Sequence, residues 1–158
     1  MLKNDSDSTW EHYGSHDPYY GVLTCDKYKT PNFDTSTRIE FFESGVTHIT
    51  TAANTIKRHI DSNFSPKTAL DFGCGVGRLL IPRARIANHV VGLDVSNSYL
   101  AECRKNCKIN SITNFELYKS DDSLSSISGK YDLIHSHMVF QHISVKRVKL
   151  FLPNSLII

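Results

Sequence analysis

The sequence predicts an α/β fold, in which parallel strands form a central sheet and helices pack against it. Three observations favour this prediction. A short apolar run, residues 68–72, leads into a glycine-rich turn and then into a helical pattern. A second apolar run, residues 89–94, ends in an acid and precedes another helical pattern. Strand and helix patterns continue to alternate after that, which is typical of a parallel sheet with right-handed crossovers.

The composition is that of an ordinary globular domain. The chain has 158 residues, of which 40% are hydrophobic and 22% are charged, and this length corresponds to one domain. A formal net charge of +2 with scattered basic residues does not favour a nucleic-acid-binding surface. No apolar stretch is long enough to cross a bilayer, and the N-terminus lacks the hydrophobic region of a signal peptide. We therefore expect a cytoplasmic protein without a membrane or nucleic-acid partner.

The cysteines do not follow the spacing of a disulfide framework or a zinc ribbon. They stand at positions 25, 74, 103 and 107. Cys103 and Cys107 are one helical turn apart, but no nearby His or Cys pair completes a metal site. The expectation is free thiols in a reducing compartment and no bound metal.

Residues 1–34 form an aromatic N-terminal segment, and residues 35–158 form the main domain. The segment is too rich in large rings for a disordered tail; they are Trp10, Tyr13, Tyr19, Tyr20, Tyr28 and Phe33. Two interpretations stay open: an arm that lies across the surface of the domain, or a lid over its site. Asp17 followed by Pro18 is interpreted as a turn.

The first long helix is expected to follow Asp34. Apolar residues recur there at alternating intervals of three and four positions, which gives one apolar face; they are Ile39, Phe42, Val46, Ile49, Ala53, Ile56 and Ile60. Asp34 or Ser36 can cap its start. Gly45 is a candidate break between two helices, and Ser65-Pro66 ends the region before the first strand.

Further elements follow the glycine turn. Helices are predicted over residues 78–87 and 97–109, with Ser96 as the N-cap of the second. Strands are predicted over residues 114–118 and 130–136, and a last helix from Ser144 to about Leu152. Proline at position 82 is tolerable because it falls near the first turn of its helix.

The glycine turn itself is the strongest functional signal. Gly73, Gly75 and Gly77 recur at every second position, and each glycine loses much backbone freedom on folding. Such a cost at a strand-to-helix turn is typical of sites where a ligand approaches the backbone closely. Asp94 follows by about 20 residues, at the end of the neighbouring strand, where a carboxylate is placed to accept hydrogen bonds from ribose hydroxyls.

The pattern Asp71-x-Gly73-x-Gly75-x-Gly77 resembles motif I of the class I S-adenosylmethionine-dependent methyltransferases, and the resemblance covers roughly residues 36–150. It implies a three-layer Rossmann-like sheet with strand order 3-2-1-4, preceded by N-terminal helices, and S-adenosyl-L-methionine as cofactor. The implied cofactor contacts are the turn around the methionine part, Asp71 at its amino group, Asp94 at the ribose, Val95 packed on the adenine, and a carboxylate at the adenine amino group. The turn comprises Gly73, Cys74, Gly75 and Gly77, and the last carboxylate is Asp121 or, one register further, Asp122.

His137 and His142 are the candidate catalytic bases. Both are expected just after the fourth strand, at the edge where open α/β sheets bind their ligands, and histidine titrates near neutral pH. The alternative is that His142 bonds a backbone carbonyl and that His135 is a satisfied core histidine. Tyr19 and Tyr20 become candidate substrate contacts if the N-terminal segment is a lid.

The acceptor is expected to be a small molecule, with a protein side chain as the second choice. The sequence has neither the Pro-Cys motif of cytosine-5 methyltransferases nor a complete D-P-P-Y motif. The expected activity is therefore methyl transfer to a small-molecule acceptor by in-line displacement.

The resembling fold has seven strands, whereas this chain supplies four predicted strands. A C-terminally shortened domain is therefore expected, with an open edge at the fourth strand through which the chain can self-associate. A cofactor-binding pseudo-enzyme or fragment without independent activity is the alternative. A nicotinamide-dependent oxidoreductase is a third hypothesis, which the glycine spacing and the acid before Gly73 disfavour.

Overall fold

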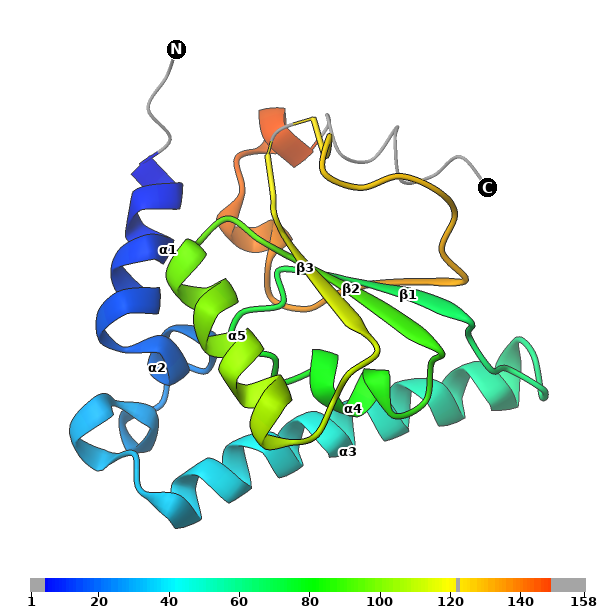
Figure 1. Ribbon diagram of the computed structural model, residues 1–158, viewed down its shortest axis with the longest axis horizontal. Coiled ribbons are helices and arrows are strands. Elements are labelled where there is room, and N and C mark those ends of the chain that lie inside the picture. Colours follow the sequence, from blue (N-terminus) through cyan, green and yellow to red (C-terminus); the bar gives the residue numbers. More distant parts are fainter. Residues whose placement is uncertain (1–4, 122, 149–158) are drawn as a thin grey trace.

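The protein is described by a computed structural model that covers residues 5–121 and 123–148. Its centre is a parallel sheet of four strands, β1 (Thr68–Phe72), β2 (His89–Asp94), β3 (Phe115–Lys119) and β4 (Leu133–Ser136). The strand order is β3-β2-β1-β4, with β3 and β4 at the two edges (Figure 1). The predicted sheet and its order are confirmed. Within the described part of the chain, no helix is long and apolar enough to cross a membrane.

Helices cover one face of the sheet. They are α3 (Thr35–His59), α4 (Leu80–Ala84) and α5 (Asn97–Ile109), and α3 runs beneath the other two (Figure 1). Ala69 and Val90 point from the strands into this layer, where they pack against Leu80, Leu100 and Cys103. A cluster of buried apolar side chains therefore fills the space between helices and sheet.

Other segments cover the second face. Leu70, Phe72, Val91 and Leu93 point to this side, because successive side chains of a strand alternate. They pack against Leu124 and against partly buried residues of the loop before β4 and of the segment after it; these are Ile127, Tyr131, Val139 and Ile143. The segment after β4 contains a 3-10 turn, η3 (Phe140–His142), and residues 145–148 are helical. The described part of the predicted last helix is thus present.

The long helix α3 is continuous, and Asp34 caps it by accepting a hydrogen bond from the Thr37 N–H at 2.8 Å. The break predicted at Gly45 is absent. A Cβ at this glycine would lie 2.1 Å from the Arg78 carbonyl oxygen, so Gly45 allows the helix to approach the chain after the glycine turn.

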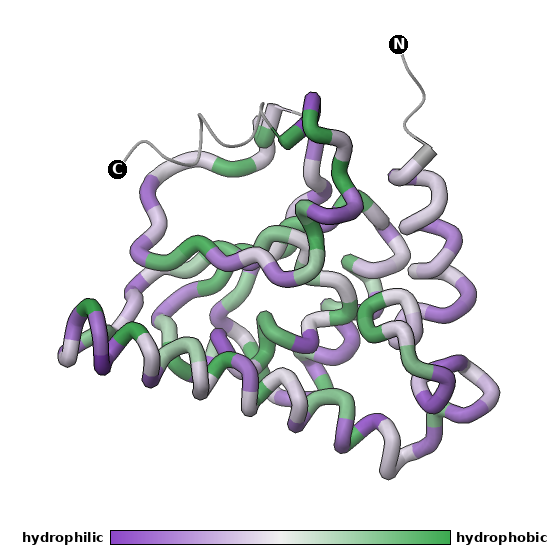
Figure 2. Tube along the Cα trace, turned by 180° about the vertical axis from the view of Figure 1, so that it is seen from behind, coloured by the Kyte–Doolittle hydropathy of each residue, from purple (hydrophilic) through white to green (hydrophobic). Residues whose placement is uncertain are grey.

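The predicted apolar face of α3 is confirmed in part, since Phe42, Ala53 and Ile56 are half-buried and Ile49 is buried. Phe41, Gly45 and Ile49 are buried, whereas Ile39 is 54% exposed and Ile60 81% exposed. Figure 2 shows purple and green residues alternating along this helix. Ile49 was thus predicted correctly, whereas the burial of Phe41 and Gly45 was not predicted, since a glycine carries no hydrophobic signal.

The helix predicted over residues 78–87 is shorter than expected, since α4 spans only Leu80–Ala84. The turn that begins at Gly73 continues to residue 79, and the first helical bond after it joins the Ile81 N–H to the Gly77 carbonyl at 3.0 Å. Pro82 lies within the first turn of α4, as predicted.

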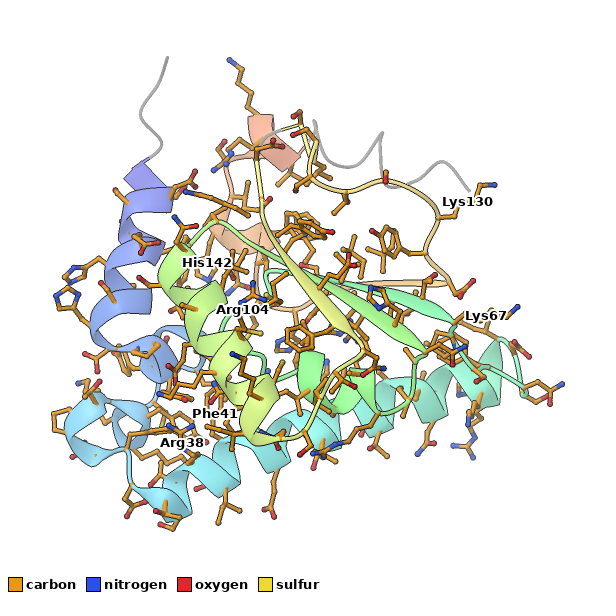
Figure 3. All side chains as sticks on the ribbon, viewed as in Figure 1. Arg38, Phe41, Lys67, Arg104, Lys130 and His142 are labelled. Carbon is orange, nitrogen blue, oxygen red and sulfur yellow. The ribbon has the colours of Figure 1, made fainter. Side chains whose placement is uncertain are left out.

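The N-terminal segment is helical and packs against the domain. It contains α1 (Asp5–His16), α2 (Pro18–Val22) and two 3-10 turns, η1 (Asp26–Tyr28) and η2 (Thr30–Asn32). Tyr19 and Tyr28 are buried in a third cluster with Phe41, Val76 and Tyr99. In Figure 1, α1 and α2 lie beside α5. Figure 3 labels Arg38 and Phe41 at the start of α3, below this segment.

Asn106 of α5 joins three parts of the chain. It is 1% exposed, and its Nδ2 donates to the carbonyl of Val76 in the glycine turn at 3.0 Å. Its Oδ1 accepts from Arg38 Nη1 at 3.0 Å and lies 3.2 Å from the Tyr19 hydroxyl. The N-terminal segment, α3 and the turn therefore share one buried polar side chain.

Replacing Gly45 with alanine tests the close approach of α3. The added Cβ would collide with the Arg78 backbone, so we expect Gly45→Ala to lower the free energy of unfolding by more than about 2 kcal/mol, although alanine favours an isolated helix by about 1 kcal/mol. Urea denaturation measures the difference. Thr47→Ala, on the exposed face of the same helix, is the control and should change it by less than about 0.5 kcal/mol. Equal stability of Gly45→Ala and the native chain would contradict this contact.

Candidate functional site

A cavity opens at the carboxyl ends of β1 and β2. Gly73, Gly75 and Asp94 line it from the sheet, Val22 from the N-terminal segment, and Val139 from the segment after β4. Open α/β sheets bind their ligands at this edge. The cavity is therefore the candidate site.

The glycine turn begins with two hydrogen bonds to the neighbouring strand. The Leu93 carbonyl of β2 accepts from the Gly73 N–H at 2.8 Å and from the Cys74 N–H at 2.9 Å. Gly73 and Gly75 have φ angles of +79° and +52°, a region that favours glycine. A Cβ on Gly73 would also lie 2.2 Å from Val139 Cγ2. Glycine is thus required by both the conformation and the space at the cavity wall.

Gly77 and Cys74 have a different environment and are not among the residues that line the cavity. Gly77 has a φ of +89°, and a Cβ there would lie 2.9 Å from Cys103 Sγ of α5. Cys74 is buried in the core between helices and sheet. These two predicted site residues therefore belong to the side of the turn that faces the core and α5.

Asp94 lines the cavity and is held by backbone donors. Its Oδ2 accepts from the Gly75 N–H at 2.9 Å, and its Oδ1 accepts from the Ser96 N–H at 3.0 Å. Burial raises the pKa of this carboxyl to about 6, although the N–H groups of Ser96 and Gly75 act in the opposite direction. A carboxylate has about four lone-pair positions, so it keeps capacity for hydroxyl donors in the cavity. Val95, the next residue, also lines the cavity.

Asp71 faces away from the cavity. It is 2% exposed and points into the helix-covered face, where its Oδ1 lies 3.5 Å from Arg83 Nη1 and 3.6 Å from His135 Nδ1. Its Oδ2 has no hydrogen-bond partner among the described residues. The structure therefore separates Asp71 from the other residues predicted to bind the cofactor.

Asp121 lies in the loop after β3 and is exposed. It binds within its own loop, since its Oδ1 accepts from the Ser123 and Ser125 N–H groups at 3.0 Å each. The bonds from Ser125, by its hydroxyl and its backbone, lower the pKa of Asp121 to about 2. Ser120, the residue before it, lines the cavity instead. Asp122, the alternative position, lies outside the described residues.

The two predicted catalytic histidines both line the cavity. The ring of His142 packs edge-on against Trp10 of α1, with centroids 5.0 Å apart. The ring of His137 packs against His48 of α3, with centroids 4.4 Å apart. Burial lowers the pKa of His137, and the positive charge of Arg78 acts in the same direction. His137 is thus favoured in its neutral form, which can accept a proton.

His48 was not singled out from the sequence. Its Nε2 lies 3.2 Å from His135 Nε2, so one of these rings donates to the other. Burial, followed by the neighbouring His137 and His135, lowers the pKa of His48 to about 4. His135 thus has a ring partner, as expected of a core histidine, although its Nδ1 has no hydrogen-bond partner among the described residues. Within the part of the chain that the structure describes, no group of His, Cys, Asp or Glu is arranged to hold a metal ion.

Sequence reasoning also missed further residues of the cavity, among them Asp7, Trp10, Tyr99 and Arg147. Tyr99 is 2% exposed, and its hydroxyl has no hydrogen-bond partner among the described residues. A signal for it exists in the sequence, because it stands in the first turn of the helix that follows Asp94. Asp7 and Trp10 come from α1 and Arg147 from the segment after β4, and no spacing rule brings these two parts of the chain together.

The N-terminal segment covers one side of the cavity. Arg147 binds Asp7 of α1 through two bonds, of 2.8 Å and 3.3 Å. Glu11, one turn further along α1, accepts from the Ser98 hydroxyl at the start of α5. The first helix is therefore attached both to α5 and to the segment after β4.

Comparisons with known proteins agree with this geometry. Residues 69–155 match the family described as "Methyltransferase domain". The ribosomal protein L11 methyltransferase of Lactobacillus johnsonii is 35% identical over 75 residues, which are 47% of this chain and 24% of that protein. That of Helicobacter hepaticus is 30% identical over 100 residues, 62% of this chain and 32% of that protein. The matched stretch is thus a quarter to a third of the length of these relatives.

Two solved structures share the fold over nearly the whole chain. Phosphoethanolamine N-methyltransferase 1 of Haemonchus contortus, in complex with phosphoethanolamine and S-adenosylhomocysteine, superposes with a TM-score of 0.70 at 17% identity, covering 96% of this chain and 28% of that one. Magnesium protoporphyrin IX methyltransferase of Synechocystis PCC 6803, with bound SAH, gives 0.63 at 19% identity, covering 94% and 65%. Because the family match spans more than half of the chain, this protein belongs to the methyltransferase domain family, with the Rossmann-like fold of the class I S-adenosylmethionine-dependent methyltransferases.

Proposed function

We propose that this chain binds S-adenosylmethionine in the cavity and transfers its methyl group to a small-molecule acceptor. The observation that carries the proposal is Asp94, a buried carboxylate at the end of β2 that faces the cavity. Two backbone N–H groups fix its orientation. A carboxylate fixed in this way suits the two hydroxyls of a ribose.

The cavity fits an adenosyl cofactor in two further respects. Gly73 and Gly75 expose backbone to the cavity without a Cβ, so a ligand can lie directly against the turn. The Tyr99 hydroxyl is a buried donor that has no partner among the described residues, and such a group is costly unless a ligand satisfies it. We assign Gly73, Gly75, Asp94, Val95 and Tyr99 as cofactor contacts, and Cys74 and Gly77 as residues that shape the turn.

When bound, the cofactor supplies a methyl group on a positively charged sulfur, which is open to in-line attack by a nucleophile. The residues around it have to position the acceptor and take its proton. His137 and His142 are the proposed bases, since both rings line the cavity. Burial lowers the pKa of His137, so its ring is neutral at neutral pH and has a nitrogen that can take the proton.

A small acceptor agrees with the enclosure of the cavity by the N-terminal segment. Ser6, Asp7 and Trp10 of α1 line it, and Asp7 is bonded to Arg147 on the opposite side. We therefore assign this segment the role of a lid. The L11 methyltransferases among the relatives carry a ribosomal protein in their name, so a protein acceptor is the second candidate.

Substituting Asp94 tests the cofactor site. Isothermal titration of the native chain with S-adenosylhomocysteine should show binding, and titration with NAD should show none. Asp94→Ala should weaken S-adenosylhomocysteine binding by about 10- to 100-fold, because hydrogen bonds to a charged group contribute about 1.5–3 kcal/mol. Asp61→Ala, on the exposed surface before β1, is the control. Undiminished affinity in a folded Asp94→Ala chain would remove this residue from the site.

The same carboxylate predicts how binding depends on pH. Its pKa of about 6 in the free protein means that it is ionised above this value and neutral below it. The ionised form accepts ribose hydroxyls, so the affinity for S-adenosylhomocysteine should be constant near pH 7–8 and fall roughly tenfold by about pH 5. Titration at several pH values measures this. The decline should be absent in Asp94→Asn; the same decline in that variant would assign it to another group.

Tyr99→Phe tests the unpartnered hydroxyl. The variant should be as stable as the native chain or more stable, because it removes a buried polar atom without a partner. Its affinity for S-adenosylhomocysteine should fall by about three- to tenfold, the effect of one neutral hydrogen bond. Tyr118→Phe, which removes an exposed hydroxyl bonded to Glu116 on β3, should leave binding unchanged. Unchanged binding in Tyr99→Phe would mean that this hydroxyl does not face the cofactor.

A further inference from the structure

Three histidines form a cluster beside the cavity, and only one of them, His137, lines it. His48 of α3 packs edge-on against His135 of β4 and against His137, with ring centroids 5.3 Å and 4.4 Å apart. The rings of His135 and His137 are parallel within 2°, with centroids 6.4 Å apart. His48 therefore connects a ring at the cavity with a ring of the sheet.

The histidine cluster ends at a buried carboxylate. Asp71 is paired with His135 in the register of β1 and β4, and its Oδ1 lies 3.6 Å from His135 Nδ1. Arg83 of α4 is fully buried and forms a salt bridge of 3.5 Å with the same oxygen. A guanidinium stays charged in a protein, so the carboxylate beside it is its counter-ion. Negative charge therefore lies next to one nitrogen of His135.

That charge selects the tautomer of His135. A carboxylate attracts a nitrogen that carries a hydrogen and repels one that presents a lone pair, so the hydrogen belongs on Nδ1. In the neutral ring, Nε2 then has the lone pair. Because this atom lies 3.2 Å from His48 Nε2, the hydrogen of that bond has to come from His48. Nδ1 of neutral His48 is thereby left with a lone pair.

His48 stays neutral at neutral pH. Burial lowers its pKa to about 4, and charged or titratable groups that face it act in the same direction; they are His137, His135, Arg78 and Arg83. Burial, Arg78 and His135 also lower the pKa of His137, whereas Asp71 raises it. His48 is therefore a hydrogen-bond acceptor, and not a second cation, when His137 gains a proton.

We propose that His48 is a positioning residue for His137: the charge of Asp71, acting through His135, leaves His48 with an acceptor nitrogen beside the proposed base. Neutral His137 then has its N–H next to His48 and its lone pair toward the cavity. When that lone pair takes the proton of the molecule to be methylated, the ring becomes an imidazolium. Its N–H on the far side is accepted by His48, and no proton leaves His137 in this step.

This role rests on the proposed function, because it requires His137 to act as the base. The tautomers of His135 and His48 do not depend on that activity. They can be measured separately.

The first measurement is the tautomer of each ring in the native full chain without a ligand. In isotopically labelled histidine, a ring nitrogen with a lone pair gives an NMR signal far from that of a nitrogen with a hydrogen. At about pH 8, above the usual pKa of histidine, His135 should carry its hydrogen on Nδ1 and His48 on Nε2. The reverse arrangement, with His135 Nε2 as the donor, would overturn the proposal.

The second measurement is the proton affinity of His137, read from its ring signals as the pH is varied. His48→Phe keeps a ring but removes the acceptor, so this affinity should fall about threefold or more. His48→Asn returns an oxygen near the place of Nδ1 and should recover part of the loss. His59→Phe, at the exposed end of the same helix, is the control and should leave His137 unchanged. An equal loss in His48→Asn and His48→Phe would mean that His48 only packs against His137.

Asp71→Asn tests the origin of the tautomers. The amide removes the charge next to His135 Nδ1, so the preference of His135 for a hydrogen on Nδ1 should be lost. His48 should change with it, because the two rings share one hydrogen bond. Unchanged tautomers in a variant that circular dichroism shows to be folded would contradict the proposal. The native-chain measurement does not depend on this variant.

The outcomes separate this inference from the cofactor assignment. If S-adenosylhomocysteine binds but His135 carries its hydrogen on Nε2, the cofactor site stands and the role of His48 is wrong. If the tautomers are as expected but S-adenosylhomocysteine does not bind to the folded chain, the effect of Asp71 on the cluster stands and the role of His137 as a base falls.

Discussion

The carboxyl end of β2 holds the glycine turn by hydrogen bonds, and this constraint decides where the rest of the site can lie. The Leu93 carbonyl accepts from the first two residues of the turn, and the Asp94 carboxylate accepts from Gly75. The same carboxylate accepts from Ser96, which itself caps α5 through the Tyr99 N–H. One short stretch thus orients the turn, begins a helix and presents a carboxylate to the cavity. A change there affects all three together.

The register of β1 and β2 assigns different positions to two acids that look alike in the sequence. Asp71 and Asp94 both lie at or near the end of an apolar strand, but Asp71 points into the helix-covered face beside Arg83 and His135. Phe72, one residue later, reaches the cavity. Asp71 lies beside Gly92 in the register of the two strands, so Asp94 stands two residues closer to the carboxyl edge of the sheet, where the cavity opens. The acid of the glycine motif therefore lies beside Arg83 of α4 and His135 of β4 and does not line the cavity.

Sequence patterns predicted the features that depend on neighbouring residues, such as the bounds of two strands. Residues 68–72 and 89–94 were predicted as strands with the bounds that are observed, because buried parallel strands are continuous apolar runs. Asp94 and the cavity glycines followed from the same runs. The burial of Gly45 on α3 was missed because a glycine carries no hydrophobic signal, although its close contact with the Arg78 backbone sets where the helix lies. Asp7 and Arg147 were missed because they are 140 positions apart, and only the assembled fold brings them together. The Tyr99 hydroxyl was missed because only the folded structure shows that it is buried and has no hydrogen-bond partner among the described residues.

Asn106 has a consequence for how the chain folds and unfolds. Its single amide bonds the Val76 carbonyl of the turn and the Arg38 guanidinium of α3, and the Tyr19 hydroxyl of the N-terminal segment lies beside it. Buried apolar rings of the segment surround the same place. Removal of this amide would therefore loosen the N-terminal segment, the start of α3 and the glycine turn together, because all three meet at one buried side chain.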